Sequence, residues 1–219
     1  MNTPSPAPGL TNTNIYAEIA DALSERSYCL LASPLPGNLA DSLFIHFNSL
    51  DEQDFKEAAI GRDANQHINP FIRGDRIRWI DKTHPATRDY LDWMENLRLE
   101  LNRRLFLGLF DYECQYAWYP AGAFYKKHLD AFKGNTNRVL STVLYLNPDW
   151  QPQDGGELLL YRQESDVPIE TVSPLYGRMI IFLSNEFPHE VAKTNKPRRS
   201  IAGWFRVNNS LGASIDPPG

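Results

Sequence analysis

The stretch RMIIFLSNEFPHEVAKTNKPRRSIAGWFRV, residues 178–207, contains three apolar segments separated by turn-forming residues. The segments 178–183, 189–191 and 201–207 are short and rich in Ile, Val, Phe and Trp, which favours strands over helices. The same pattern extends back to residue 108, where the apolar period changes from about 3.6 to about 2. Further candidate strands are 113–119, 124–128, 139–146, 157–161 and 170–172, so this half of the chain predicts eight short β-strands.

Helical spacing dominates the chain before residue 108. Apolar residues recur with the period of a helix between residues 15 and 23, from 39 to 50, and along the stripe that follows Pro85 as far as Leu105. The segment YCLLA between the first two helices predicts a short buried strand. A block of helices followed by many short strands predicts a mainly β fold with supporting helices, a double-stranded β-helix or jelly-roll barrel. An ordinary β-sandwich is the alternative that periodicity leaves open.

The chain of 219 residues, 42% of them hydrophobic and 22% charged, is long enough to bury one substantial core. Its two ends, 1–14 and 209–219, are polar or Pro-rich with little to bury, and we expect flexible tails there. Between them we expect one domain over 15–208, with helical support in 15–107 and the jelly-roll core in 108–208.

Charge and hydropathy exclude several classes of protein. The longest apolar runs fall short of the roughly 18 residues of a membrane span, and the first residues lack the pattern of a secretion signal. We therefore expect a cytoplasmic protein. The sequence leaves the oligomeric state open, with a monomer as the expectation. Cys29 and Cys114 lie in apolar segments and match no C-x-x-C pattern, so we expect reduced thiols in the core. A net charge of −5 with scattered basic residues argues against nucleic-acid binding.

The segment YKKHLD, residues 125–130, contains two metal-ligating side chains on one predicted strand face. His128 and Asp130 are two positions apart, so both can point toward one ion, and His189 is the best third ligand from a distant strand. Two imidazoles and one carboxylate form the facial triad of iron(II) oxygenases, although zinc in a hydrolase could use the same ligands. The tripeptide alone is a weak signal, because His128 could cap a turn and Asp130 could be an exposed loop carboxylate.

A candidate anion-binding residue follows His189. In RRSIAGWF, Arg198 alternates with Ser200, Ala202 and Trp204, so small residues lie beside a cation on one face. A guanidinium in a pocket away from water can bind a carboxylate through two hydrogen bonds. The alternative without a functional role is that Arg198 forms a surface salt bridge on an edge strand. The combination of His-x-Asp, a distant His and an Arg beyond it predicts 2-oxoglutarate dependence.

On these motifs the chain resembles the 2-oxoglutarate and iron(II) dependent prolyl 4-hydroxylases, and within them the branch of the hypoxia-inducible-factor prolyl hydroxylases and their bacterial relatives. The resemblance covers roughly residues 70–207 and is weaker in the helical N-terminal third. Besides the ligand triad, its motifs are IRGDRIRWI (72–80), YP before His-x-Asp, VLYLN (143–147), GGEL (155–158), HEV, and R-x-S-I-x-G-W (198–204). The first of these is the most discriminating.

The resemblance implies a role for each matching residue. His128, Asp130 and His189 correspond to the iron ligands. Arg198 corresponds to the partner of the distal 2-oxoglutarate carboxylate, and it is favoured over Arg199 because the alignment through the following motif needs no gap.

Further positions are implied around this set. Tyr145 would donate its hydroxyl to the same carboxylate, and Tyr119, or less well Tyr116, would lie near the metal-chelating end. The other residues expected at the cosubstrate are Val143 and Trp204.

For the substrate, the resemblance implies a loop that closes and a groove beside it. Arg73 and Asp75 match a mobile loop that covers a peptide, and Arg138 and Trp204 match positions that line the groove. Closure of residues 61–75 would gate the reaction. The alternative for Arg73 and Asp75 is a tight turn with a solvent-facing ion pair worth well under about 1 kcal/mol.

The implied reaction uses iron(II), 2-oxoglutarate and O2, with ascorbate as reductant, and releases succinate and carbon dioxide. Its expected target is C4 of a proline in a flexible segment of a protein, with translation elongation factor Tu as the candidate among bacterial relatives. Two alternatives remain open: the same chemistry on a free amino acid or another side chain, and a catalytically silent protein-binding module.

Overall fold

The computed structural model describes residues 14–58, 71–131 and 137–208. The two predicted tails and most of the predicted gating segment 61–75 lie outside the described residues, apart from Asn14 and residues 71–75. None of the described helices is both long and apolar enough to cross a membrane.

Helices occupy the first half of the described chain, and strands dominate the second half. The helices are α1 (Ile15–Arg26), α2 (Leu39–Ser49) and α3 (Pro85–Leu105), with short 3-10 turns at Glu52–Asp54 and Pro152–Asp154. The strands are β1 (Tyr28–Leu31), β2 (Lys56–Glu57), β3 (Arg76–Trp79), β4 (Leu109–Tyr119), β5 (Tyr125–His128), β6 (Arg138–Tyr145), β7 (Leu158–Tyr161), β8 (Pro168–Val172), β9 (Met179–Leu183), β10 (His189–Val191) and β11 (Arg198–Val207).

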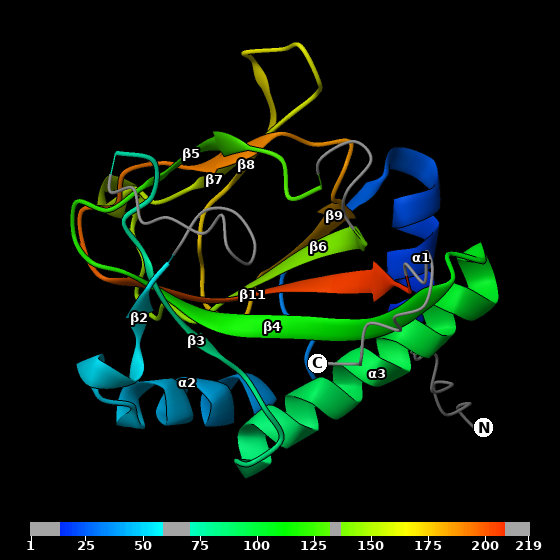
Figure 1. Cartoon of the computed structure of the whole chain (residues 1–219), viewed down its shortest axis with the longest axis horizontal. Coiled ribbons are helices and arrows are strands. Elements are labelled where there is room, and N and C mark those ends of the chain that lie inside the picture. The colour runs from blue at the N-terminus through cyan, green and yellow to red at the C-terminus, as the bar shows by residue number, and fades with distance from the viewer. Residues whose placement is uncertain (1–13, 59–70, 132–136, 209–219) are drawn as a thin grey trace, which may run out of the picture.

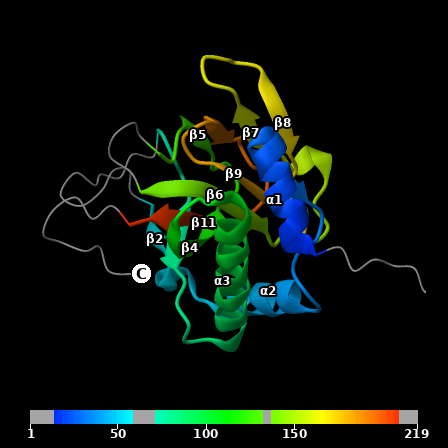
Figure 2. The ribbon, with the colours of Figure 1, turned by 90° about the vertical axis from the view of Figure 1, so that its right-hand side faces the viewer.

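The strands form two sheets that face each other. The larger has the order β1-β9-β6-β11-β4-β3-β2, and the smaller has the order β5-β10-β7-β8. All of the paired strands are antiparallel. Helices α2 and α3 lie on the far side of the larger sheet, away from the smaller one (Figure 1), and the view turned by 90° shows the same for these two helices (Figure 2). Helix α1 contributes Ile19 and Leu23 to the same core. The predicted double-stranded β-helix with supporting helices is therefore confirmed.

The larger sheet is buried on both faces, so it separates two apolar cores. Because successive strand residues point to opposite faces, β9 places Met179 and Ile181 in the core under the helices. Its Ile180 and Phe182 lie in the core between the sheets, together with residues of β7 such as Leu160. The inner face, which carries this second core, is also the face on which the polar site is built.

Local sequence signals account for the start of the long helix α3. Pro85 occupies the first turn, where a missing N–H costs nothing, and the Nδ1 atom of His84 accepts from the backbone N–H of Ala86. Leu97 and Leu101 are fully buried on the predicted stripe, and each contributes about 1.5–3 kcal/mol by burial. The helix has the bounds that the sequence predicted.

The predicted strands correspond to observed ones, with differences at their ends. The strand expected from residue 113 begins at Leu109, and the one expected from residue 201 begins at Arg198. The β4 extension pairs with the end of β11, where Asp111 lies opposite Arg206, and the β11 extension pairs with the end of β4, where Arg198 lies opposite Tyr119. Each extension is therefore held by the partner strand. The two cysteines are free and buried, as expected.

Candidate metal centre

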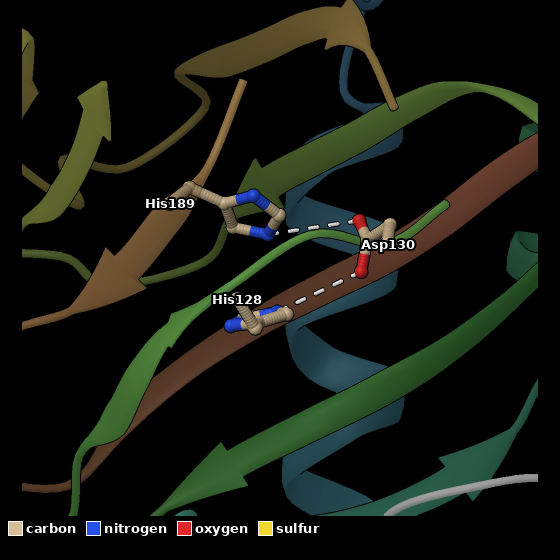
Figure 3. Close-up of side chains that lie close together, drawn as sticks. All are labelled: His128, Asp130 and His189. Atoms are coloured by element: carbon tan, nitrogen blue, oxygen red, sulfur yellow. Dashed lines mark ion pairs between the residues drawn. The ribbon is translucent and has the colours of Figure 1, made fainter. Parts of the chain in front are cut away.

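Three metal-ligating side chains meet where β5 ends and β10 begins. His128 and His189 are directly paired across these two strands, and Asp130 follows β5 by two positions. The side chains point toward one another (Figure 3), and their ligand atoms all lie within 4.8 Å of one another. The Nε2 atoms of His128 and His189 lie 3.6 Å from Oδ1 and Oδ2 of Asp130, respectively. The predicted triad is therefore brought together.

Backbone carbonyls determine which nitrogen each histidine presents to the centre. Nδ1 of His128 lies 2.8 Å from the carbonyl oxygen of Lys126, and Nδ1 of His189 lies 3.1 Å from that of Phe187. A carbonyl oxygen only accepts, so each Nδ1 carries the proton and donates. Nε2 is therefore the nitrogen that each histidine presents to Asp130 and to a metal ion.

Burial and neighbouring groups set the protonation of the triad. Burial lowers the pKa of His189 to about 4, and the facing His128 ring acts in the same direction, so His189 is neutral near pH 7. Burial alone would raise the pKa of Asp130, but the two imidazole rings and Arg138 outweigh it and hold that pKa well below its ordinary value. Two imidazoles and an ionised carboxylate fit a divalent metal ion such as iron(II) or zinc.

A hydroxyl relay holds the Asp130 carboxylate. Ser141 on β6 donates from Oγ to Oδ2 of Asp130 at 2.7 Å, and its Oγ lies 2.9 Å from Oγ of Ser184. The Asp130 side chain is only 11% exposed, so it is not the exposed loop carboxylate of the alternative interpretation. Sequence reasoning missed Ser141, although its two-residue spacing from Val143 on the inner face of β6 could have indicated it.

Arg198 lies on the inner face of β11 and is 1% exposed. Its Nε donates to the carbonyl oxygen of Gly156 at 2.9 Å, and its Nη1 donates to Ser200 Oγ at 3.2 Å. The guanidinium carbon lies 4.9 Å and 5.1 Å from the ring centroids of Tyr119 and Tyr145. Within the described residues no carboxylate lies within ion-pairing distance of Arg198, so it is not part of a surface salt bridge.

Tyr145 adds a second donor to this pocket. It is fully buried, and its hydroxyl has no hydrogen-bond partner among the described residues. Burial raises the pKa of Tyr145 to about 12, with Arg198 opposing the rise, so the hydroxyl keeps its proton. A buried cation beside an unsatisfied hydroxyl fits the carboxylate of a ligand such as 2-oxoglutarate.

Steric contacts explain the two glycines of the GGEL turn beside this pocket. Gly156 has φ of +70°, and a Cβ there would lie 3.0 Å from Cδ of Arg198. At Gly155, where φ is +67°, a Cβ would lie 2.5 Å from the carbonyl oxygen of Lys193. Both positions therefore require glycine, and Gly156 brings its carbonyl within reach of Arg198.

The structure decides between the tyrosines and arginines that the sequence left open. Tyr119 is paired with Arg198 in the strand register and lies beside it. Tyr116 faces the helices instead, where its hydroxyl lies 3.0 Å from Nδ1 of His46. The expectation that Tyr116 could serve the cosubstrate is therefore wrong, because residues three apart on a strand point to opposite faces. Arg199 also lies on the helix side, near Phe47.

Arg73 and Asp75 form a buried ion pair. Nε and Nη2 of Arg73 donate to Oδ1 and Oδ2 of Asp75 at 2.7 Å and 2.6 Å, and the two side chains are 12% and 1% exposed. The solvent-facing turn of the alternative interpretation is excluded. The Arg73 guanidinium carbon lies 4.4 Å from the ring centroid of Tyr125, and that ring stacks on His128 with centroids 3.6 Å apart. Sequence reasoning missed Tyr125 as the link between this pair and the triad.

The remaining predicted residues lie on the same inner face. Trp204 pairs in register with Ser141, and the Arg138 guanidinium carbon lies 3.6 Å from the centroid of its indole ring. Trp204 is 8% exposed, and its Nε1 has no partner among the described residues. Val143 is partly buried and packs against the core that contains Tyr145. The structure thus gathers every predicted site residue except Tyr116 on or beside this face.

Comparison with known proteins agrees with this geometry. A family model described as the 2OG-Fe(II) oxygenase superfamily matches residues 114–206. The crystal structure of a Pseudomonas putida prolyl-4-hydroxylase is similar, with a TM-score of 0.79 and 39% sequence identity over 89% of this chain and 100% of that chain. A Trichoplax adhaerens prolyl hydroxylase, in complex with a hypoxia inducible factor oxygen degradation domain peptide fragment, has a TM-score of 0.74 and 26% identity, covering 88% of this chain and 89% of that chain.

A curated human relative matches over a shorter part. Egl nine homolog 1 of Homo sapiens is 29% identical over 143 residues, which are 61% of this chain and 33% of that protein. This chain therefore spans about a third of the length of that relative.

Proposed function

This chain belongs to the 2-oxoglutarate and iron(II) dependent prolyl hydroxylases, and we propose that it hydroxylates a prolyl residue at C4 in a protein substrate. One oxygen atom of O2 enters the proline, and the other enters succinate as 2-oxoglutarate loses carbon dioxide. The observation that carries the proposal is a His-Asp-His triad on the same inner face as a buried arginine and an unsatisfied tyrosine hydroxyl.

Each residue has a distinct task in the proposed reaction. His128, Asp130 and His189 hold iron(II), which supplies the oxidising chemistry when bound with 2-oxoglutarate and O2. Arg198 binds the distal carboxylate of 2-oxoglutarate through its guanidinium, and Tyr145 donates its hydroxyl to the same group.

Other inner-face residues shape the two binding regions. Tyr119 lies beside Arg198 and lines the cosubstrate pocket, and Val143 contributes apolar surface that excludes water. Trp204 and Arg138 line the substrate groove. Arg73 and Asp75 border the groove, and they reach the triad through Tyr125.

The test is metal-dependent turnover with a proline peptide. The protein is incubated with iron(II), ascorbate as the proposed reductant, 2-oxoglutarate and peptides that carry proline in a flexible segment. We expect succinate and a mass gain of one oxygen on proline, and the variant Asp130→Ala should abolish both while keeping the fold. Surviving turnover in that variant would contradict the triad assignment.

The same assay separates the alternative functions. Oxygen gain on free amino acids only would indicate a small-molecule oxygenase, and absence of succinate under every condition would indicate a silent binding module. Hydrolytic activity with zinc and none with iron would indicate a hydrolase. As the specific target we propose elongation factor Tu, a choice that rests on the family resemblance, and intact elongation factor Tu is the substrate for the second arm of the assay.

A further inference from the structure

Four charged side chains from three strands form a continuous ladder on the inner face of the larger sheet. Arg138 on β6 donates from Nε and Nη2 to Oε1 of Glu113 on β4, at 3.1 Å and 2.8 Å. Oε2 of Glu113 lies 3.0 Å from Nη1 of Arg206 on β11. Arg206 in turn donates from Nε to Oδ1 of Asp111 at 2.9 Å, and from Nη2 to Oδ2. Glu113 is thus the link between the two arginines.

The ladder ends beside the proposed substrate groove. The Arg138 guanidinium lies flat against Trp204, with 3.6 Å between its carbon and the ring centroid. Trp204 is paired in register with Ser141, whose hydroxyl holds Asp130, so the Arg138 end of the ladder is next to the metal centre. Trp79 on β3 lies against Trp204 with ring centroids 6.4 Å apart.

The formal charges of the ladder cancel. Two arginines face two carboxylates, and the side chains of Arg138 and Glu113 are 19% and 17% exposed, so each is largely shielded from water. The neighbouring strand β3 turns Arg76 and Arg78 toward the other face, as its register with β4 requires. It contributes Trp79, which is 53% exposed, to the inner face.

Two further charges lie near this wall. The Asp130 carboxylate belongs to the proposed metal centre, and Arg73 forms an ion pair with Asp75. Among the described residues, the groove wall formed by Trp79, Trp204 and Arg138 is therefore aromatic, and the guanidinium charge of Arg138 is compensated by Glu113.

We propose that Glu113 determines substrate specificity by neutralising Arg138. With Glu113 in place, the wall favours a proline segment whose flanking side chains are uncharged and apolar, because aromatic rings bind apolar groups and the guanidinium charge is already compensated. This inference rests on the proposed function. Among the described residues, Glu113 binds Arg138 and Arg206, and no hydrogen bond or ion pair joins it to the triad or to Arg198. It therefore acts on the choice of substrate rather than on cosubstrate binding.

The test compares two proline peptides that differ only in one residue beside the proline, Glu or Gln. For the unmodified protein, the ratio of kcat/KM for the Glu and Gln peptides should be close to or below one. In Glu113→Gln, the ion pair of Arg206 with Asp111 stays, while Arg138 loses its ion pair with the Glu113 carboxylate. We expect the ratio to rise about fivefold in favour of the acidic peptide, and the gain to shrink at high salt because it is electrostatic.

Two variants control for a general loss of structure. Glu113→Asp keeps the negative charge and should return the ratio toward that of the unmodified protein. Glu95→Gln removes a comparable arginine partner on α3, where Glu95 binds Arg98 at 2.6 Å and 2.8 Å, and should leave the ratio unchanged. A ratio that does not move in Glu113→Gln, or that moves equally in Glu95→Gln, overturns the inference. If neither peptide is hydroxylated by the unmodified protein while the family cosubstrates are present, the proposed function fails instead.

Discussion

Replacing Arg198 with lysine tests the proposed cosubstrate site directly. The side chain is 1% exposed, and its Nε and Nη1 bonds to the Gly156 carbonyl and to Ser200 fix the plane of the guanidinium. Lysine keeps the positive charge, but it lacks the planar fork that can make these bonds and also bind a carboxylate at two points. The substitution therefore separates the geometry of the site from its charge.

The expected effect follows from the loss of one charge-assisted hydrogen bond. Such a bond contributes about 1.5–3 kcal/mol, which corresponds to a rise of about 10-fold to 150-fold in the KM for 2-oxoglutarate. The KM for the peptide should change little, because Arg198 does not contact the groove wall at Arg138 and Trp204 in any recorded interaction among the described residues. Succinate formation is measured at varied 2-oxoglutarate and a fixed, saturating peptide concentration.

Arg199→Lys is the matched control. Arg199 is the next residue, but it points to the helix side near Phe47, and this variant should keep its KM for 2-oxoglutarate within about twofold. If Arg198→Lys left that KM unchanged, or if both variants raised it equally, the assignment of Arg198 as the carboxylate partner would be refuted.

Three further predictions concern positioning, packing and pH. Ser141→Ala removes the hydroxyl that holds Asp130 and should weaken iron(II) binding by about 10-fold in a metal titration of the apo protein. Gly156→Ala introduces a Cβ 3.0 Å from Arg198 at a φ of +70° and should cost about 1–3 kcal/mol of unfolding free energy, measured by urea denaturation. Burial and a stacked histidine lower the pKa of His46, so the unfolded chain takes up that proton at higher pH than the folded chain. Its contribution to stability should be complete above about pH 6.5 and should be lost as the pH falls through the lowered folded pKa. The urea midpoint should show this loss, and His46→Gln should reduce it.

The period-two pattern explains why the sequence predicted so much of the metal centre. His128 and Asp130 share a face once the segment is a strand, and the strand bounds of β10 place His189 at its first residue. Parity also limits the remaining choices, since Tyr119 and Tyr116 cannot face the same side. Only the register of β4 against β11 shows which of the two lies beside Arg198, and a single sequence does not contain that register.

The sequence could not predict contacts between distant strands either, because these contacts also depend on the strand register. The ladder at Glu113 joins β4, β6 and β11, and nothing in the local spacing of its members indicates that they meet. The sequence also did not predict the burial of the Arg73–Asp75 ion pair, because R-G-D is equally compatible with an exposed turn. Local patterns predict which face a side chain occupies, whereas its neighbours across the sheet depend on tertiary pairing.

The pairing of the R-G-D segment with β5 bears on how a covering loop could act. Gly74 donates its N–H to the carbonyl of Phe124 at 3.0 Å, and the carbonyl of Ile72 accepts from Lys126 at 2.9 Å. The described end of the segment is thus hydrogen-bonded to the strand that carries His128, in addition to the stack of Arg73 on Tyr125 described above. Moving this end away from the barrel would break two backbone hydrogen bonds and a cation–aromatic contact, each worth about 0.5–1.5 kcal/mol. A substrate that contacts Arg73 would therefore act on a segment already joined to the metal centre, so its binding could influence the orientation of His128 without displacing that end of the loop.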